Sequence, residues 1–332
     1  MVDLSIGVPE CPVKYIDSLS VAIENDGVKC GKYPSSFFKE EAEVIEKIFL
    51  KKLGIKNVLD SGLTVHHGGR GALYTVFCAL SRIGLNEIFT SIPYWNGYSS
   101  ILGSIESNMK ISSGECKNKC SAALICMPNN PDGRVDLERL VHLVAVYEYV
   151  VIDLVYFSFL STDEVEKISL ILKDRTNYIL IFSTSKFCAT PNLRVGYSYT
   201  PNKFLYEIVT RKQFELSNYP SMLNRQLAMK YLSERKVTRA ITSYYHEILD
   251  NVRPLITPEG VSFSANGMFM WIVCSDCSSD IVVREIFQKC NIKGMAGHDF
   301  GESRGSRWLL RADVDYRHLL EQVFLLNKEK QK

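Results

Sequence analysis

The sequence predicts an α/β fold in which a mostly parallel sheet lies between helices, joined to a smaller α+β domain. Three observations predict it. The 332 residues are 46% hydrophobic and 23% charged, as in globular chains of about two domains. Short continuous apolar runs alternate with amphipathic helical patterns through the middle of the chain, as buried strands and crossover helices do. The C-terminal part instead combines long helical stretches with short strands.

The charge balance and the apolar runs exclude several classes of protein. Lys and Arg total 39, Asp and Glu total 37, and both signs are spread along the chain, so nucleic acid is not an expected partner. No apolar run approaches the about 20 residues that span a bilayer, and residues 1–10 have neither a basic segment nor a long apolar run. We therefore expect a cytoplasmic protein without a membrane partner.

The cysteines predict neither disulfides nor a metal site. All ten are scattered without regular spacing, which predicts reduced thiols in a chain large enough to fold without staples. Cys116 and Cys120, and likewise Cys274 and Cys277, have a spacing seen in metal sites. Neither pair has a second Cys or His pair at the usual distance, so we expect no metal.

Two helices are expected at the start of the large domain. Residues 38–53 place apolar side chains at helical spacing, and Gly54 follows as a stop signal. After a short apolar segment, a glycine turn at 66–71 opens a helix whose apolar face ends at Gly84. Such a turn offers free N–H groups and the positive end of a helix dipole to a phosphate, although glycine turns before helices are common.

Three continuous apolar runs, at 122–127, 149–153 and 178–182, predict strands buried on both faces. The first run ends in a Pro-Asn-Asn-Pro-Asp-Gly turn, and Asp136 is placed to cap the next helix. Parallel sheets bind ligands at the carboxyl ends of their strands. Because Asn130, Asp153 and residues 183–186 all fall at such ends, we expect their polar groups to converge.

The C-terminal part continues with helical stretches through Lys230 and His246, short strands at 261–264 and 268–273, and a closing helix at 316–326. The N-terminal residues are polar and broken by Pro and Gly, so we expect them to pack on a neighbouring part of the chain or on another subunit. These observations predict a large α/β domain at 36–215. They predict a small α+β domain, with an N-terminal arm, at 1–35 and 216–332.

The strongest local motif is Ser-Thr-Ser-Lys186, with Arg194 eight residues after the lysine. A lysine directly after a buried strand, flanked by hydroxyls and an arginine, suits a Schiff-base lysine beside a phosphate pocket, because a partly desolvated amine is nucleophilic. Asp153, Tyr156 and Asn130 supply the partners of a pyridine cofactor, namely an acid for the ring nitrogen and donors for the ring hydroxyl. Taken singly, each feature also has a structural interpretation as a solvated strand end, a cap or a turn.

Six motifs, in order along the chain, resemble those of the fold-type I pyridoxal phosphate (PLP) enzymes. The similarity is greatest to the class I and II aminotransferases, with local similarity to histidinol-phosphate aminotransferases and threonine-phosphate decarboxylases. The motifs are Tyr33-Pro34, Gly68-Gly-Arg-Gly-Ala-Leu73, Pro93-Tyr-Trp-Asn-Gly-Tyr98, Asn129-Asn-Pro-Asp-Gly133, Asp153-Leu-Val-Tyr156, and Ser183-Thr-Ser-Lys186 with Arg194-Val-Gly-Tyr197; weaker continuations are Gly267-Met-Phe-Met-Trp271, Phe300-Gly301 and Leu309-Leu-Arg311. The resemblance implies PLP as the cofactor and a seven-stranded, mostly parallel PLP domain beside a small domain, as in aspartate aminotransferase.

The resemblance also implies roles at the cofactor ring. Lys186 would form the internal aldimine and then shuttle the proton at the substrate α-carbon. Asp153 would keep the ring nitrogen protonated. Tyr156 and Asn130 would hydrogen-bond the ring oxygen, and Trp95 would stack on the ring, with ordinary core packing as its alternative.

Further implied roles concern the cofactor phosphate. Gly69 and Arg70 would bind it through backbone N–H groups, Ser183 and Ser185 through hydroxyls, and Arg194 through its guanidinium. These residues come from the glycine turn and from the segment around the lysine.

The implied substrate site and subunit contact involve other residues. Arg311 would bind the substrate carboxylate, with Asn130 beside it, and Arg307 is the competing candidate. Tyr33 would reach the phosphate of the neighbouring subunit, which implies a homodimer with shared active sites; local packing of a loop tyrosine is the alternative. Arg70 would favour an acidic or phosphorylated substrate side chain or take part in a structural ion pair.

The chain departs from the family pattern at several places. Leu154 stands where an acidic residue is common, residues 187–192 replace a glycine-rich stretch, and the glycine expected after Tyr33 is missing. We therefore expect unusual specificity. His66 and His67, next to the glycine turn, lack a fixed partner in the sequence and are expected to be structural.

Together these inferences predict a PLP-dependent aminotransferase of amino-acid metabolism that acts on an amino acid or on an amine derived from one. A 2-oxo acid would accept the amino group in a two-stage ping-pong reaction through the Schiff base of Lys186. Because the same lysine and aspartate support other bond cleavages, a PLP-dependent lyase, decarboxylase or cyclase of amino-acid tailoring is the alternative. A non-catalytic binding protein that kept the fold is an alternative of another class.

Overall fold

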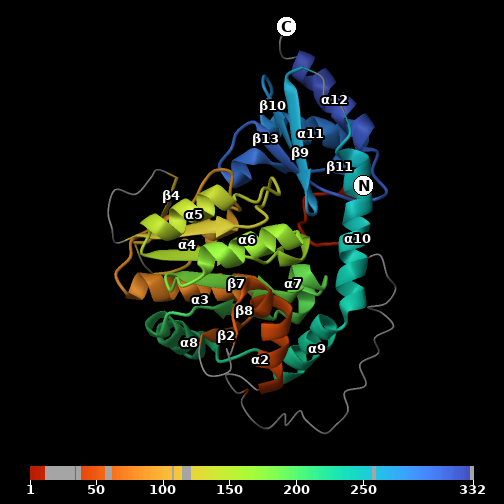
Figure 1. Ribbon diagram of the computed structural model, residues 1–332. Coiled ribbons are helices and arrows are strands. Elements are labelled where there is room, and N and C mark those ends of the chain that lie inside the picture. Colours follow the sequence, from red (N-terminus) through yellow and green to blue (C-terminus); the bar gives the residue numbers. More distant parts are fainter. Residues whose placement is uncertain are drawn as a thin grey trace.

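The computed structural model describes residues 1–11, 34, 39–56, 62–106, 108–113, 121–255 and 259–329, and its larger part is built on one sheet (Figure 1). The strand order is β2-β8-β7-β6-β5-β3-β4. The bounds are β2 (Leu63–His66), β3 (Glu87–Phe89), β4 (Lys110–Ser112), β5 (Ala122–Cys126), β6 (Tyr149–Asp153), β7 (Tyr178–Ser183) and β8 (Gly196–Tyr199). β8 runs antiparallel to β2 and β7, whereas the other pairs of neighbouring strands are parallel. This confirms the predicted seven-stranded, mostly parallel sheet.

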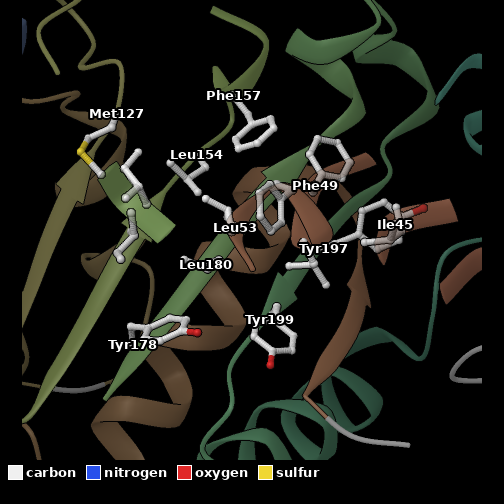
Figure 2. Close-up of a cluster of buried hydrophobic side chains, with 14 of the residues drawn as sticks. Ile45, Phe49, Leu53, Met127, Leu154, Phe157, Tyr178, Leu180, Tyr197 and Tyr199 are labelled. Atoms are coloured by element: carbon white, nitrogen blue, oxygen red, sulfur yellow. The ribbon is translucent and has the colours of Figure 1, made fainter. Parts of the chain in front are cut away.

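Each face of this sheet has its own buried core, because alternate residues of a strand point to opposite faces. On one face Ala123, Ile125, Val150, Ile152, Leu180 and Phe182 pack with α2 (Lys39–Ile45), α5 (Leu137–Val146) and α6 (Thr162–Leu172). On the other, Ala122, Leu124, Val151, Ile179 and Ile181 pack with α3 (Gly68–Arg82), α4 (Gly97–Leu102) and α8 (Lys203–Ser217). Figure 2 shows part of the first core, where Phe49 and Phe157 meet edge to face with ring centroids 5.6 Å apart.

The helix predicted at 38–53 is divided in the structure. It begins as α2, continues as a π-helical turn at Glu46–Leu50 and ends in a 3-10 turn at Lys51–Leu53. A π turn holds more residues than an α turn, which allows both Phe49 and the adjacent Leu50 to face the core. Gly54 follows in the left-handed region at φ 76°. A glycine in this conformation commonly ends a helix, in agreement with the predicted stop signal.

The smaller part contains an antiparallel sheet in the order β12-β13-β10-β9. Its strands are β9 (Val261–Asn266), β10 (Phe269–Cys274), β12 (Met295–Ala296) and β13 (Gly305–Leu309), packed with α11 (Ser279–Cys290) and α12 (Tyr316–Glu329). Two helices, α9 (Met222–Ser233) and the long α10 (Arg235–Val252), connect this part to the larger sheet (Figure 1). The short β1 (Val2–Asp3) pairs in parallel with β11 (Ile292–Lys293), so the first residues of the chain lie against the smaller part.

Of the two domain boundaries predicted from the sequence, at residues 36 and 215, only the second falls among the described residues. Residue 215 lies inside α8, which continues to Ser217, and residue 36 lies outside the described residues. The division into 36–215 and the remainder stays a prediction. The local predictions around the larger sheet are confirmed: the glycine turn opens α3, and Asp136 caps α5 by accepting a hydrogen bond from the Arg139 N–H at 2.9 Å.

The described residues also bear on membranes and metals. Within these ranges no helix has both the length and the apolar character needed to cross a bilayer. In the same residues, His, Cys, Asp and Glu side chains form no group of three or more that could hold a metal ion. Cys274 and Cys277 are buried, whereas Cys116 and Cys120 lie outside the described residues.

Candidate active site

A cavity of about 420 Å³ lies at the carboxyl ends of β5, β6 and β7, the edge at which parallel sheets bind ligands. Most of the site residues that the sequence predicted line this cavity. Its lining includes Gly69, Arg70, Trp95, Asn130, Asp153, Tyr156, Ser183, Ser185, Lys186, Arg194 and Arg307. Arg311 is not among the lining residues, and Tyr33 lies outside the described residues.

Lys186 enters the cavity from α7 (Thr184–Phe187), a single turn that follows β7 directly. Ser183 starts this turn, because its hydroxyl accepts a hydrogen bond from the Ser185 N–H at 3.2 Å. The Lys186 amine donates a hydrogen bond to the carbonyl of Gly7. Loss of solvent, reinforced by the positive charges of Arg307 and Arg194, lowers the pKa of Lys186 to about 8. A larger fraction of this amine is therefore neutral and nucleophilic near neutral pH.

Asp153 ends β6, next to Cys126 on β5 and Ile181 on β7. Its carboxylate accepts hydrogen bonds from the Tyr98 hydroxyl at 2.8 Å and from the Val155 N–H at 3.2 Å. Burial raises the pKa of Asp153 to about 6, although both hydrogen bonds oppose that shift. The carboxylate is thus fixed in direction and ready to bind a cationic N–H group.

A chain of hydrogen bonds crosses the cavity from the larger sheet to the smaller one. The Asn130 amide donates to the Tyr156 hydroxyl at 3.1 Å, and Arg307 Nη1 donates to Asn130 Oδ1 at 2.9 Å. The Arg307 guanidinium lies over the rings of Phe269 and Phe300, 4.7 and 5.1 Å from their centroids. Burial lowers the pKa of Arg307 to about 10, and its Nε has no hydrogen-bond partner within the described residues. This cation retains capacity for an anionic ligand.

Glycines shape the end of the cavity at the start of α3. Gly68 has φ +74°, and a Cβ there would lie 2.7 Å from Arg194 Nη2. A Cβ on Gly196 would lie 2.5 Å from the Gly68 carbonyl carbon. Larger residues would therefore push the turn away from Arg194. His67 at the N-cap makes no side-chain capping bond, and Gly69 and Arg70 in the first turn of this fifteen-residue helix line the cavity. The first N–H groups of a helix have no partner within the helix and suit an anion.

Trp95 and Arg70 form another part of the lining. The Trp95 ring packs edge to face with Tyr98 at 5.2 Å between centroids. The exposed Arg70 guanidinium lies over the Trp95 ring at 5.3 Å from its centroid, within cation–π range. Among the described residues the structure records no ion pair for Arg70, so nothing there supports the structural ion pair that the sequence left open.

The two candidate carboxylate-binding arginines occupy different places. Arg307 lies in the cavity, whereas Arg311 pairs with Glu10 at 3.0 Å and with both carboxylate oxygens of Asp313 at 2.8 Å. The geometry therefore favours Arg307 over the sequence's preferred Arg311. Arg307 lies within β13 and Arg311 follows shortly after it, and spacing alone could not distinguish them.

Sequence reasoning also missed several residues of the cavity. Ser5, Ile6, Gly7 and Val8 of the N-terminal segment line it; in Figure 1 this red segment lies near α10 and the smaller sheet. Alternating apolar residues between Val2 and Val8 were an available strand signal. Tyr98 belongs to a motif quoted from the sequence, but its hydrogen bond to Asp153 is visible only in the structure.

His66 occupies the structural position that the sequence favoured. Its two ring nitrogens lie 2.7 Å from Gln213 Oε1 and 2.8 Å from Ser198 Oγ. Burial lowers the pKa of His66 to about 4, so the ring is neutral at physiological pH. It is not among the residues that line the cavity.

Comparisons with known proteins agree with this geometry. The family model described as aminotransferase class I and II matches residues 2–309. Histidinol-phosphate aminotransferase 2 of Archaeoglobus fulgidus is 26% identical over 182 residues, 52% of this chain and 52% of that protein. The histidinol-phosphate aminotransferase of Pelagibacter ubique is 24% identical over 231 residues, 64% of this chain and 61% of that protein. The matches thus span about half to three fifths of the length of these relatives.

Solved structures resemble the chain over nearly its whole length. They include aspartate aminotransferase from Thermotoga maritima (TM-score 0.78, 20% identity, 100% of this chain and 92% of that chain). L-threonine-O-3-phosphate decarboxylase from Porphyromonas gingivalis has a TM-score of 0.71 and 19% identity, with 99% of this chain and 100% of that chain covered. These likenesses show an aspartate aminotransferase-like fold. With the family match, they establish that the chain belongs to the class I and II aminotransferase family of PLP-dependent, fold-type I enzymes.

Proposed function

We propose that this chain is an aminotransferase that moves the amino group of an amino acid, or of an amine derived from one, to a 2-oxo acid. The observation that carries the proposal is the meeting of four kinds of group in one cavity. They are the Lys186 amine, the Asp153 carboxylate, the glycine turn beside Arg194, and the Arg307 guanidinium. Each suits one requirement of the reaction.

The residues at the glycine turn fit the phosphate of PLP. The N-terminus of α3 offers N–H groups, and Arg194 lies against Gly68. The Ser185 hydroxyl is buried and has no hydrogen-bond partner within the described residues, and buried polar atoms of this kind require one. We assign Gly69, Arg70, Ser183, Ser185 and Arg194 to the phosphate.

The remaining ring-binding groups lie on the strand ends. When bound, PLP supplies an aldehyde and an electron-withdrawing ring that stabilises negative charge at the substrate α-carbon. Lys186 would hold the cofactor through its amine and then take and return a proton at Nζ. Asp153 would hold the ring nitrogen, Tyr156 and Asn130 would bind the ring oxygen, and Trp95 would cover the ring face.

Arg307 is the residue that we assign to the substrate carboxylate. Its guanidinium is buried and lies over two aromatic rings, and Asn130 fixes its direction through Nη1. A planar fork of this kind binds a carboxylate through two parallel hydrogen bonds. Such a contact would select substrates that carry a carboxylate and would orient the bonds of the α-carbon.

We also propose a cytoplasmic homodimer. Phe214 and Leu216 near the end of α8 expose 61% and 42% of their surface. Leu216 lines a second cavity of about 530 Å³, to which Arg70 also contributes. Exposed apolar side chains next to a site are typical of protein interfaces. Mass measurement by light scattering during size-exclusion chromatography tests the dimer, and a monomer at micromolar concentration would contradict it.

Absorbance spectroscopy of the purified protein loaded with PLP tests the proposed activity. Wild type should show the visible band of lysine-bound cofactor, and Lys186→Ala should lack it. Lys203→Ala, which removes an exposed lysine of α8, is the matched control and should keep the band. Adding an amino acid without a 2-oxo acid should convert the cofactor to its amine form, and a 2-oxo acid should then reverse the change.

Other outcomes of this experiment identify the alternatives. A persistent band with accumulation of ammonia, carbon dioxide or a cyclic product would replace the aminotransferase with a lyase, decarboxylase or cyclase. A band that no amino compound alters would point to a binding protein. Absence of any band in the wild type would refute the assignment of Lys186.

A further inference from the structure

The N-terminal residues 5–8, here named the cover segment, lie against two of the basic side chains that line the cavity, Arg307 and Lys186. The Ser5 carbonyl accepts a hydrogen bond from Arg307 Nη2, and the Gly7 carbonyl accepts one from the Lys186 amine. The fit at Gly7 is close, because a Cβ there would lie 3.2 Å from the Phe269 ring. Any reagent that reaches Lys186 from this side must pass the cover segment.

The residues before the cover segment are firmly attached. β1 pairs with β11, the Leu4 N–H donates to the Lys293 carbonyl at 2.7 Å, and the Leu4 carbonyl accepts from the Leu309 N–H at 2.9 Å. The Leu4 side chain is fully buried. The cover segment itself has no strand pairing within the described residues. Apart from its bonds to Arg307 and Lys186, its position therefore depends on how it is held at its other end.

Glu10 provides the attachment on that side. Its carboxylate lies 3.0 Å from Arg311 Nη1 and accepts a hydrogen bond from the Tyr244 hydroxyl, while its N–H donates to the Tyr245 hydroxyl at 2.8 Å. Arg311 is held in turn by Asp313 through two bonds of 2.8 Å. Charge-assisted bonds of this kind fix both partners more strongly than neutral ones do.

We propose that Glu10 and Arg311 are positioning residues that hold the cover segment over Lys186 and so control how readily small molecules reach its amine. The inference rests on the proposed role of Lys186 as the cofactor lysine. Neither residue lines the cavity, so both act through the cover segment. Tyr244 and Asp313 fix the direction of the pair, which gives one defined position for the chain that leads from Glu10 to Gly7.

Removal of the cofactor by hydroxylamine tests this proposal without requiring the substrate. The rate at which hydroxylamine abolishes the visible band of the PLP-loaded protein reports access to Lys186. Glu10→Gln and Arg311→Ala should each raise this rate about three- to tenfold, the factor for losing one partly exposed charged hydrogen bond. Arg311→Lys, which keeps the charge, should recover part of the loss. The double variant Glu10→Gln, Arg311→Ala should react no faster than either single variant, because the two residues act as one unit.

A matched control separates positioning from general stability. Glu285→Gln removes a carboxylate of similar exposure that pairs with Arg284 at 3.3 Å and does not line the cavity. Its rate of cofactor removal by hydroxylamine, the stripping rate, should equal that of wild type. Variants with a lowered melting temperature but an unchanged stripping rate would overturn the proposal, and so would additive effects in the double variant. A wild-type protein that takes up no PLP would refute the proposed function itself, whereas a loaded protein whose rate ignores Glu10 would refute this inference alone.

Discussion

The two walls of the Lys186 cavity differ in how the chain builds them. The sheet wall consists of the carboxyl ends of β5, β6 and β7, which are neighbours in one sheet and carry Asn130, Asp153 and Lys186 at or just beyond these ends. The opposite wall joins the two ends of the chain, since Arg307 donates to the carbonyl of Ser5 across 302 positions of sequence. The sheet wall holds groups suited to the cofactor, and the opposite wall holds the cation suited to a substrate carboxylate.

Under the proposed function, this difference would separate the groups that set the type of reaction from those that select the substrate. Hydrogen-bonded parallel strands keep their ends at a fixed spacing, so the groups on the sheet wall have little freedom. The opposite wall depends on packing between a short N-terminal segment and the smaller sheet. We expect changes on the sheet wall to affect every substrate alike, and changes on the opposite wall to affect substrates according to their charge.

The largest effect is expected at Asp153. Asp153→Asn removes the negative charge that would hold the ring nitrogen. The new amide oxygen can still accept the hydrogen bond from the Tyr98 hydroxyl. We expect kcat to fall about a thousandfold for all amino substrates, measured by steady-state kinetics with PLP in excess. A loss confined to one class of substrate would break the distinction between the walls.

A buried ion pair in the larger part of the molecule tests how much the fold that carries the sheet wall depends on one charged contact. Arg225 on α9 binds the Glu41 carboxylate of α2, and the Tyr197 hydroxyl donates to the same carboxylate at 3.0 Å. Arg225→Met leaves Glu41 buried without its cation, so we expect a loss of about 3 kcal/mol in the free energy of unfolding by urea. The double variant Glu41→Gln, Arg225→Met should recover part of that loss. If Arg225→Met and wild type had the same free energy of unfolding, the ion pair would not stabilise the fold.

Arg307 tests the opposite wall. Arg307→Lys keeps a positive charge but loses the planar fork. We expect kcat/KM for amino acids to fall about a hundredfold, the effect of losing one strong charged hydrogen bond, with little change for amines that lack the carboxylate. Arg311→Lys is the control variant. Any change that it causes in kcat/KM should be the same for substrates with and without a carboxylate. The reverse result would restore the prediction made for Arg311 from the sequence.

The smallest effect is expected at Tyr98, and it is tested through pH. The folded pKa of Asp153, about 6, lies above its usual value of 3.8. Its contribution therefore favours folding fully below about pH 4 and is lost as the pH rises to about 6. The Tyr98 hydroxyl lowers that pKa, so Tyr98→Phe should extend the loss to higher pH in the cofactor-free protein. Urea unfolding between about pH 4 and 8 measures the shift, and a downward shift would contradict it.

The sequence predicted much of the sheet wall because its motifs are local. Apolar runs located the central strands, and the residue after each run had to lie at the edge of the sheet where ligands bind. The π turn after α2 could not be predicted in this way, because it depends on both Phe49 and Leu50 packing into one core. The hydrogen bond from Tyr98 to Asp153 likewise requires two elements to meet.

By itself, the sequence determined the α/β class, the family resemblance and the set of residues at the strand ends. Those features follow from periodicity and from short motifs, which are properties of neighbouring residues. Only the tertiary structure decided that Arg307 enters the cavity while Arg311 pairs with Glu10, and that residues 5–8 lie over Lys186. The physical reason is that these contacts join the two ends of the chain, and their partners are chosen by packing rather than by spacing along the sequence.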